Sequence, residues 1–177
     1  MLLALLSGQR GQTLHLIDIR NVHVSDSNVK IVIGDLLKNS KPGKHLGEMN
    51  FPAYKYNENL CIVKTLEFYL QKTRPLRGTI TSLFITSQRP YKAISRDTLA
   101  RWMKSVMSTA GIDISIFKPH STRSAASSTA HALKIPMATI LRTVGWSKDC
   151  VFRKFYNKPI VADSSFSEKL LANFKSD

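Results

Sequence analysis

The chain has 177 residues, 43% of them hydrophobic, so it can bury one core and is most simply one domain spanning residues 1–177. Its 26 Lys and Arg against 12 Asp and Glu leave a net charge of +14, which favours a polyanionic partner. Apolar runs are too short to cross a bilayer, and the distant Cys61 and Cys150 form no zinc motif. We therefore expect no membrane span, no zinc site and a reducing intracellular compartment.

The predicted elements begin with a helix and a small sheet. Residues 1–7 form an apolar run that stops at Gly8, which indicates the end of a helix. Three short β-favouring runs follow, separated by turn residues: NVHVSD, VKIVIGD and HLGEMNFP. They predict a three-stranded antiparallel sheet.

Helices dominate the rest of the predicted chain. Apolar residues recur at helical spacing within residues 58–71, and LFIT is expected to be a short buried segment. Ser95 caps the next helix, which ends before Gly111. Its expected apolar stripe consists of Leu99, Trp102, Met103 and Val106. Three more helices are expected after His120, over 137–144 and over 148–155, so the predicted fold class is mainly α with a small three-stranded antiparallel sheet (α+β).

A histidine and an arginine stand three residues apart in FKPHSTRSAASSTA. At a helix start, His120 and Arg123 would project from one face and could hold one anion. Taken alone, such a pair is also typical of ordinary surface residues. Between Lys118 and Ile160, however, eight basic residues stand against Asp149 alone, so positive charge is concentrated around this motif.

Other basic residues lie in predicted turns. LLSGQRGQ places Arg10 in a glycine-flanked turn after the first helix, where it can reach outward or serve simply as a helix-capping cation. GDLLKNSKPGKH places Lys38, Lys41 and Lys44 in or beside the connection between the second and third strands. Lys38 directly follows the apolar run of the second strand, so we select it over Lys41 and Lys44 as a functional candidate.

Two aromatic residues follow the basic motif. VGWSKDCVFRKFYNKP places Trp146 just after a glycine helix stop and Tyr156 near the end of the next helix. Taken singly, each is typical of a core residue. The order Arg, Lys, His-x-x-Arg, Gly-Trp, Tyr nevertheless resembles that of the tyrosine recombinases.

Four segments carry this resemblance. SGQRGQ resembles the first arginine box of the family, PHSTRSAASS its H-x-x-R box, TILRTVGW its G-[HW] box and FRKFYNKPI its nucleophile segment. They are most similar to recombinases of eukaryotic Crypton and DIRS-type mobile elements. The resemblance implies the tyrosine recombinase catalytic-domain fold, without the helical core-binding domain that normally precedes it. The catalytic residues that it implies are Arg10, Lys38, His120, Arg123, Trp146 and Tyr156.

The chemistry of these residue types agrees with that assignment. An unperturbed tyrosine has a pKa of ~10 and needs a cationic neighbourhood to act as a nucleophile. Two arginines can clamp a phosphate in forked geometry, His120 can donate or relay a proton, and Lys38 can protonate the departing 5′-oxygen. No carboxylate cluster for magnesium stands out, so we expect strand cleavage and rejoining with no cofactor, metal or ATP.

The resemblance also implies partners. We expect double-stranded DNA and a tetramer-like homo-oligomer on it, in the nucleus if the source is eukaryotic and otherwise in the cytoplasm. Residues 162–177 are predicted to form an amphipathic helix that is exchanged with a neighbouring protomer or folds back on its own domain. Three other functions remain open: a domesticated, catalytically silent DNA-binding protein, topoisomerase-type relaxation, and an RNA-binding basic protein, for which stacking motifs are not found.

Overall fold

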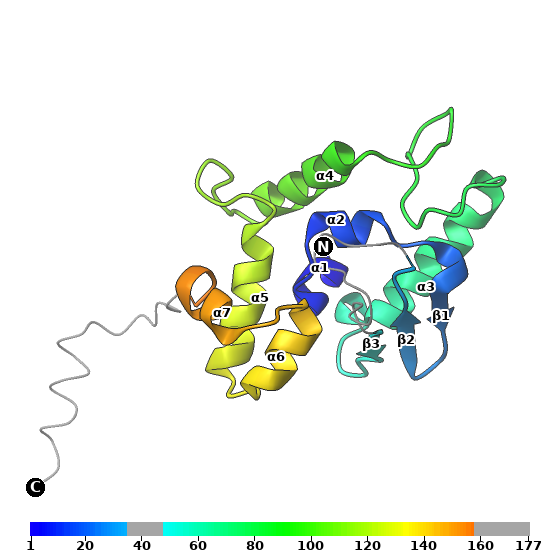
Figure 1. Ribbon diagram of the computed structural model, residues 1–177. Coiled ribbons are helices and arrows are strands. Elements are labelled where there is room, and N and C mark those ends of the chain that lie inside the picture. Colours follow the sequence, from blue (N-terminus) through cyan, green and yellow to red (C-terminus); the bar gives the residue numbers. More distant parts are fainter. Residues whose placement is uncertain (35–47, 158–177) are drawn as a thin grey trace, which may run out of the picture.

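The computed structural model describes residues 1–34 and 48–157, which form helices around a small sheet (Figure 1). The helices are α1 (Leu2–Ser7), α2 (Gly11–His15), α3 (Ile62–Thr73), α4 (Arg96–Thr109), α5 (Ser121–Ala132), α6 (Met137–Val144) and α7 (Asp149–Phe155). Short 3-10 helices cover Ile19–Asn21, Glu58–Leu60 and Arg74–Leu76. The strands are β1 (Val22–Val24), β2 (Asn28–Ile31) and β3 (Met49–Pro52). The predicted fold class is confirmed.

The sheet has three antiparallel strands, as the three β-favouring runs predict, and their order is β1-β2-β3. Each strand is shorter than its run. On β2, Val29 and Ile31 are fully buried while Lys30 between them is exposed, the period-2 pattern of a sheet with one covered face. Helix α3 contacts all three strands and covers that face. The sheet and α3 thus form one side of the molecule.

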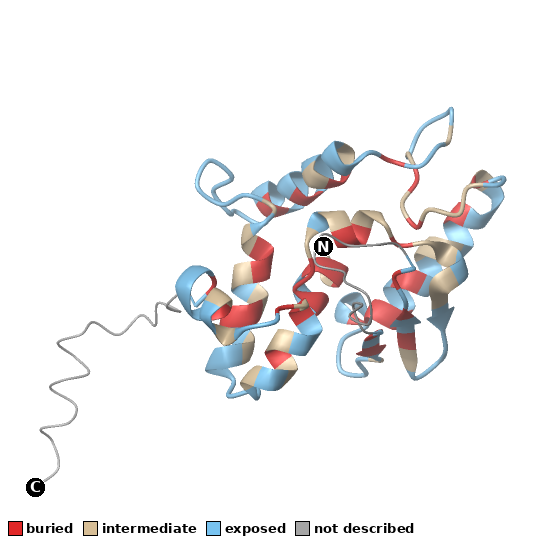
Figure 2. Cartoon of the chain, in the orientation of Figure 1, coloured by how far each residue is buried: buried red, intermediate tan, exposed pale blue. Residues whose placement is uncertain are grey.

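Helices α1 and α2 connect this side of the molecule to the remaining helices. In Figure 1, α1 and α2 lie between the sheet with α3 and the group formed by α5, α6 and α7. Helix α1 contacts α5, and α2 contacts α4. Figure 2 shows that α5 and α6 both contain buried segments. The helical group has its own small hydrophobic core, separate from the larger core that includes residues of the sheet and α3. This smaller core consists of Ile140, Val144, Trp146, Phe152 and Tyr156.

The apolar residues expected on helix α4 are only partly buried. Leu99 and Met103 are buried as expected, but Trp102 is 36% exposed and Val106 46% exposed. Among the described elements, α2 is the main contact of α4, so only a narrow face of this helix is covered. Met107 takes the third buried position instead, because it continues the i, i+4 spacing from Leu99 and Met103.

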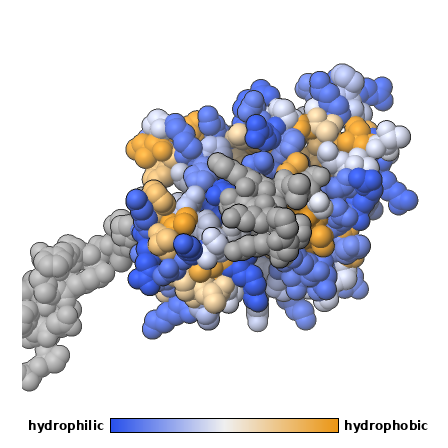
Figure 3. Space-filling model, in the orientation of Figure 1, coloured by the Kyte–Doolittle hydropathy of each residue, from blue (hydrophilic) through white to orange (hydrophobic). Residues whose placement is uncertain are grey.

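The surface agrees with the basic composition of the chain. The face drawn in Figure 3 is mainly hydrophilic, with apolar side chains in small separate groups. No helix within residues 1–34 and 48–157 combines the length and apolar character needed to cross a bilayer.

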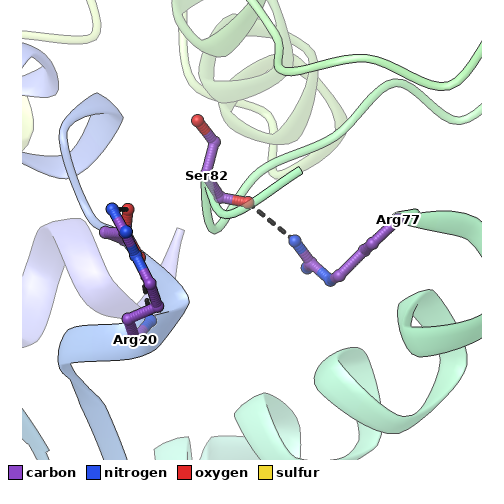
Figure 4. Close-up of polar contacts among 4 residues, drawn as sticks. Arg20, Arg77 and Ser82 are labelled. Carbon is purple, nitrogen blue, oxygen red and sulfur yellow. Dashed lines mark hydrogen bonds and ion pairs between the residues drawn. The ribbon is translucent and has the colours of Figure 1, made fainter. Parts of the chain in front are cut away.

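One buried arginine has a structural role. Arg77 is 5% exposed, and its guanidinium donates to the carbonyl of Ser82 at 2.6 Å (Figure 4). It also donates to the hydroxyl of Thr73 at 3.0 Å and to the carbonyl of Leu83 at 2.7 Å. These bonds tie the end of α3 to the segment that follows it. Neutral acceptors therefore satisfy this cation on all three nitrogens.

Candidate active site

The turn that carries Arg10 is fixed against the end of α6. Gly8 ends α1 with a φ of 59°, and a Cβ at this position would lie 2.7 Å from Cγ1 of Val144. This close approach in the left-handed region explains the glycine. The buried Gln9 donates from Nε2 to the carbonyl of Thr143 at 2.6 Å. Arg10 then follows as the N-cap residue of α2, a helix that the sequence did not predict.

Arg123 lies in the first turn of α5 and is turned into the protein. Only 1% of the residue is exposed. Its Nη1 donates to the carbonyl of Gly8 and its Nη2 to the carbonyl of Val144, both at 2.7 Å. The sequence predicted that His120 and Arg123 project side by side at the start of this helix. His120 is its exposed N-cap residue. Arg123 is turned inward, where its planar guanidinium fork spans the two carbonyls.

Two aromatic rings pack against this guanidinium. The Cζ atom of Arg123 lies 4.5 Å from the ring centroid of Trp146 and 5.6 Å from that of Tyr156. The two rings are 4.5 Å apart at an interplanar angle of 44°. Both residues are buried, at 7% and 9% exposure. The contacts are cation–π interactions that hold Trp146, Tyr156 and Arg123 as one packed unit.

The hydroxyl of Tyr156 reaches the imidazole of His120. The distance between the hydroxyl oxygen and Nε2 is 3.2 Å. A hydroxyl can donate to a neutral imidazole nitrogen or accept from its N–H, so this pair can pass a proton in either direction. The structure therefore brings together four of the six predicted site residues: His120, Arg123, Trp146 and Tyr156.

Two donors at the centre of this group are buried without an acceptor. They are Nε of Arg123 and Nε1 of Trp146. A buried donor left unpaired costs about 1–3 kcal/mol, and such groups are rare in folded proteins. Both belong to side chains in van der Waals contact with the Tyr156 ring or with each other. An acceptor that entered beside Tyr156 would meet these donors.

The electrostatics of the site are cationic. Burial lowers the pKa of Arg123 to about 10, the charge of Arg10 acts in the same direction, and Tyr156 opposes both. Burial also lowers the pKa of His120, and the charges of Arg123 and Arg10 lower it further. Arg10 therefore lies near enough to act on both residues, although no contact joins it to them. Positive charge of this kind stabilises an anion that enters the site.

This arrangement predicts the titration of His120. Its imidazole should titrate below the ordinary value of about 6.5 and be neutral at pH 7. In Arg10→Gln, one of the three causes is removed, so the pKa of His120 should rise but stay below its ordinary value. NMR titration of the histidine ring measures this shift.

The matched control is Arg20→Gln, since Arg20 is exposed and pairs with Asp18 at 2.7 Å. It should leave the His120 titration unchanged. The lowered pKa also sets a sign for stability. Between the folded and the unfolded pKa the unfolded chain binds more protons, so the free energy of unfolding falls as the pH drops through this window. An unchanged His120 pKa in Arg10→Gln would place Arg10 outside the site.

The remaining lysine candidates lie outside the described residues. Lys38, Lys41 and Lys44 all fall within residues 35–47, and the predicted helix over 162–177 falls within 158–177. Within residues 1–34 and 48–157, no group of three or more His, Cys, Asp or Glu side chains is placed to hold a metal ion.

Sequence reasoning missed the residues that support the site. Gln9 holds the Arg10 turn, and Ser128 of α5 donates to the carbonyl of Tyr156 at 2.6 Å. No local sequence pattern predicts the contacts of Gln9 and Ser128, because each bond joins segments far apart in the chain. The carbonyls of Gly8 and Val144 could not be predicted either, since main-chain acceptors leave no mark in a sequence.

Comparison with solved structures gives the class of the fold. The chain aligns over 98% of its length with the XerA recombinase at a TM-score of 0.64 and 17% identity, covering 55% of that chain. It aligns over 98% with the XerH site-specific recombinase bound to its difH substrate, at a TM-score of 0.63 and 12% identity, covering 44% of that chain. A lambda integrase tetramer bound to a Holliday junction aligns with 93% of the chain at a TM-score of 0.53 and 18% identity, covering 43% of that chain.

These likenesses show that the part of the chain described by the structure has the tyrosine recombinase catalytic-domain fold. The chain spans about half the length of the recombinases that it matches. No protein-family sequence model matches the chain, and no curated protein sequence is significantly similar to it. The fold is thus shared at low sequence identity.

Proposed function

We propose that this chain is the catalytic domain of a tyrosine recombinase that cleaves and rejoins DNA through a covalent 3′-phosphotyrosine. The hydroxyl of Tyr156, 3.2 Å from Nε2 of His120 and with its ring against Arg123, is the observation that carries the proposal. The shared fold supports it. From the resemblance to Crypton and DIRS-type recombinases, we also propose that the chain originates in a mobile element. Its proposed location is the nucleus if the source is eukaryotic and otherwise the cytoplasm.

In the proposed reaction, the oxygen of Tyr156 attacks the scissile phosphorus. The new bond joins this oxygen to phosphorus while the bond from phosphorus to the 5′-oxygen breaks. His120 takes or relays the phenol proton, and Lys38 supplies the proton that makes the leaving group a 5′-hydroxyl. A 5′-hydroxyl that attacks the phosphotyrosine reverses these bond changes, so rejoining needs no ATP.

The arginines are proposed to bind the phosphate oxygens. Arg10 reaches the site from the turn before α2, and its charge already acts on His120 and Arg123. Nε of Arg123 and Nε1 of Trp146 are buried donors without an acceptor, and phosphate oxygens would supply acceptors of the right kind. Since the ring of Tyr156 packs on Arg123, phosphate entry requires this ring to swing aside while its main chain stays in place.

The proposed partner is duplex DNA, on which the chain would form a tetramer-like synapse. Two of the solved structures are a lambda integrase tetramer on a Holliday junction and a lambda integrase dimer on a core site. We propose that the segment 162–177, which has an amphipathic pattern, is exchanged between protomers in this assembly. Such an exchange would couple each Tyr156 to a paired site.

DNA binding should depend strongly on salt. Each phosphate that the +14 chain neutralises releases counterions, so the logarithm of affinity should fall linearly with the logarithm of salt concentration. Between about 50 and 200 mM salt, affinity should drop roughly 10³- to 10⁵-fold if about 6 to 10 phosphates are contacted. Fluorescence anisotropy with duplexes of unrelated sequence measures both this slope and the expected sequence tolerance. A flat salt response would favour a protein partner.

The catalytic proposal is tested with a nicked suicide DNA substrate. Cleavage releases the short strand beyond the nick, so a covalent protein–DNA complex should accumulate without metal or ATP. A chain that binds the duplex but forms no complex would be the domesticated, silent DNA-binding protein. A chain that forms the complex and relaxes supercoiled plasmid, but does not exchange strands, would be a topoisomerase.

A further inference from the structure

Ser128 lies on α5, five residues after Arg123, and is buried at 5% exposure. Its hydroxyl donates to the main-chain carbonyl of Tyr156 at 2.6 Å. Tyr156 is the C-cap residue of α7, with φ −125° and ψ −14°, so the helix does not continue beyond it. The last carbonyls of a helix have no intrahelical partner, and here a side chain from another helix supplies the donor.

Helix α5, together with its N-cap residue, therefore contacts both the side chain and the main chain of Tyr156. His120 reaches its hydroxyl, Arg123 packs on its ring, and Ser128 holds its carbonyl. On its own helix, the amide of Tyr156 is held by the carbonyl of Phe152 at 2.8 Å. We infer that Ser128 is a positioning residue that fixes the main chain of Tyr156, so that the side chain turns about a fixed point toward a phosphate between His120 and Arg123.

This inference rests on the proposed function and predicts a specific kinetic effect. Removing the hydroxyl in Ser128→Ala leaves the Tyr156 carbonyl without its donor, so the side chain samples more positions. The rate of covalent complex formation on the suicide substrate should fall about tenfold, the usual size for one lost hydrogen bond, while DNA affinity stays unchanged. Ser128→Thr keeps the hydroxyl and should recover most of the rate.

The matched control is Ser127→Ala. Ser127 is the neighbouring residue, is also buried at 1% exposure, and donates at 2.8 Å to the carbonyl of Arg123 within its own helix. Its loss should cost similar stability without slowing cleavage. If Ser127→Ala and Ser128→Ala slow cleavage equally, or if Ser128→Ala cleaves as fast as the wild type, Ser128 has only a structural role and the inference is wrong.

A second measurement needs no catalysis. NMR of the full chain without DNA should show NOEs from the ring protons of Tyr156 to those of Trp146 and His120, whose ring centroids lie 4.5 Å and 5.8 Å from it. These NOEs should weaken in Ser128→Ala and persist in Ser128→Thr and Ser127→Ala. Unchanged NOEs in Ser128→Ala would overturn the inference. Absence of a covalent complex with wild-type protein would instead overturn the proposed function, and the NOEs would still test the role of Ser128.

Discussion

Tyr156→Phe is expected to bind DNA as tightly as the wild type and to form no covalent complex with it. The substitution removes one oxygen and its contact with Nε2 of His120 at 3.2 Å. The ring remains, so the packing on Trp146 at 4.5 Å and on Arg123 at 5.6 Å is preserved. Because the proposed reaction needs that oxygen as the nucleophile, the loss should be complete rather than partial. Denaturing electrophoresis after incubation with labelled suicide substrate measures it.

The chain offers a matched control for the loss of a phenol oxygen. Tyr54 is 45% exposed and lies in the loop after β3, where its ring contacts Tyr56. Tyr54→Phe should form the covalent complex at the wild-type rate. A complex that persists in Tyr156→Phe would mean that another side chain is the nucleophile, and peptide mapping of that complex would identify it.

The fold could be predicted from the sequence where the hydrophobic period agrees with the residues that begin and end an element. Helix α6 has the predicted bounds, since it lies between Pro136, which has no backbone N–H to bond a preceding helical turn, and Gly145, whose φ is 72°. The three β-favouring runs predicted the three-stranded antiparallel sheet. Helix α2 was missed because five residues are too few for an apolar period to show.

Burial on α4 could not be predicted from period alone. Trp102 and Val106 extend the apolar stripe of this helix, yet both are exposed. Which part of a stripe is covered depends on the width of the neighbouring element, and α2 is only one turn long. A sequence specifies which residues could be buried on a helix, but the neighbour decides which of them are.

The candidate site divides in the same way. The identities of His120, Arg123, Trp146 and Tyr156 came from the order and spacing of motifs, and the structure places the four in contact. The inward orientation of Arg123 was not predicted. Its inward turn depends on two carbonyls from α1 and α6, which lie far from it in sequence, and no local pattern encodes that meeting.

That orientation gives Arg123 two functions, one in the stability of the fold and one in the proposed reaction. In Arg123→Lys, the shorter side chain lacks the planar fork that spans the carbonyls of Gly8 and Val144, so we expect one buried acceptor to lose its donor and stability to fall by about 1–3 kcal/mol. The Nε donor that is proposed to meet a phosphate oxygen is lost as well. Cleavage should therefore slow by about 10²- to 10³-fold, while DNA binding persists through the other basic residues.

Arg77→Lys is the control that separates these two effects. Arg77 is also buried, also donates to two main-chain carbonyls, and lies at the end of α3, outside the candidate site. Both variants should lose comparable stability in urea denaturation. At a temperature where both remain folded, only Arg123→Lys should lose cleavage on the suicide substrate. If the two variants cleave equally well, Arg123 serves the fold alone, and the phosphate must be held by Arg10 and by residues outside this group.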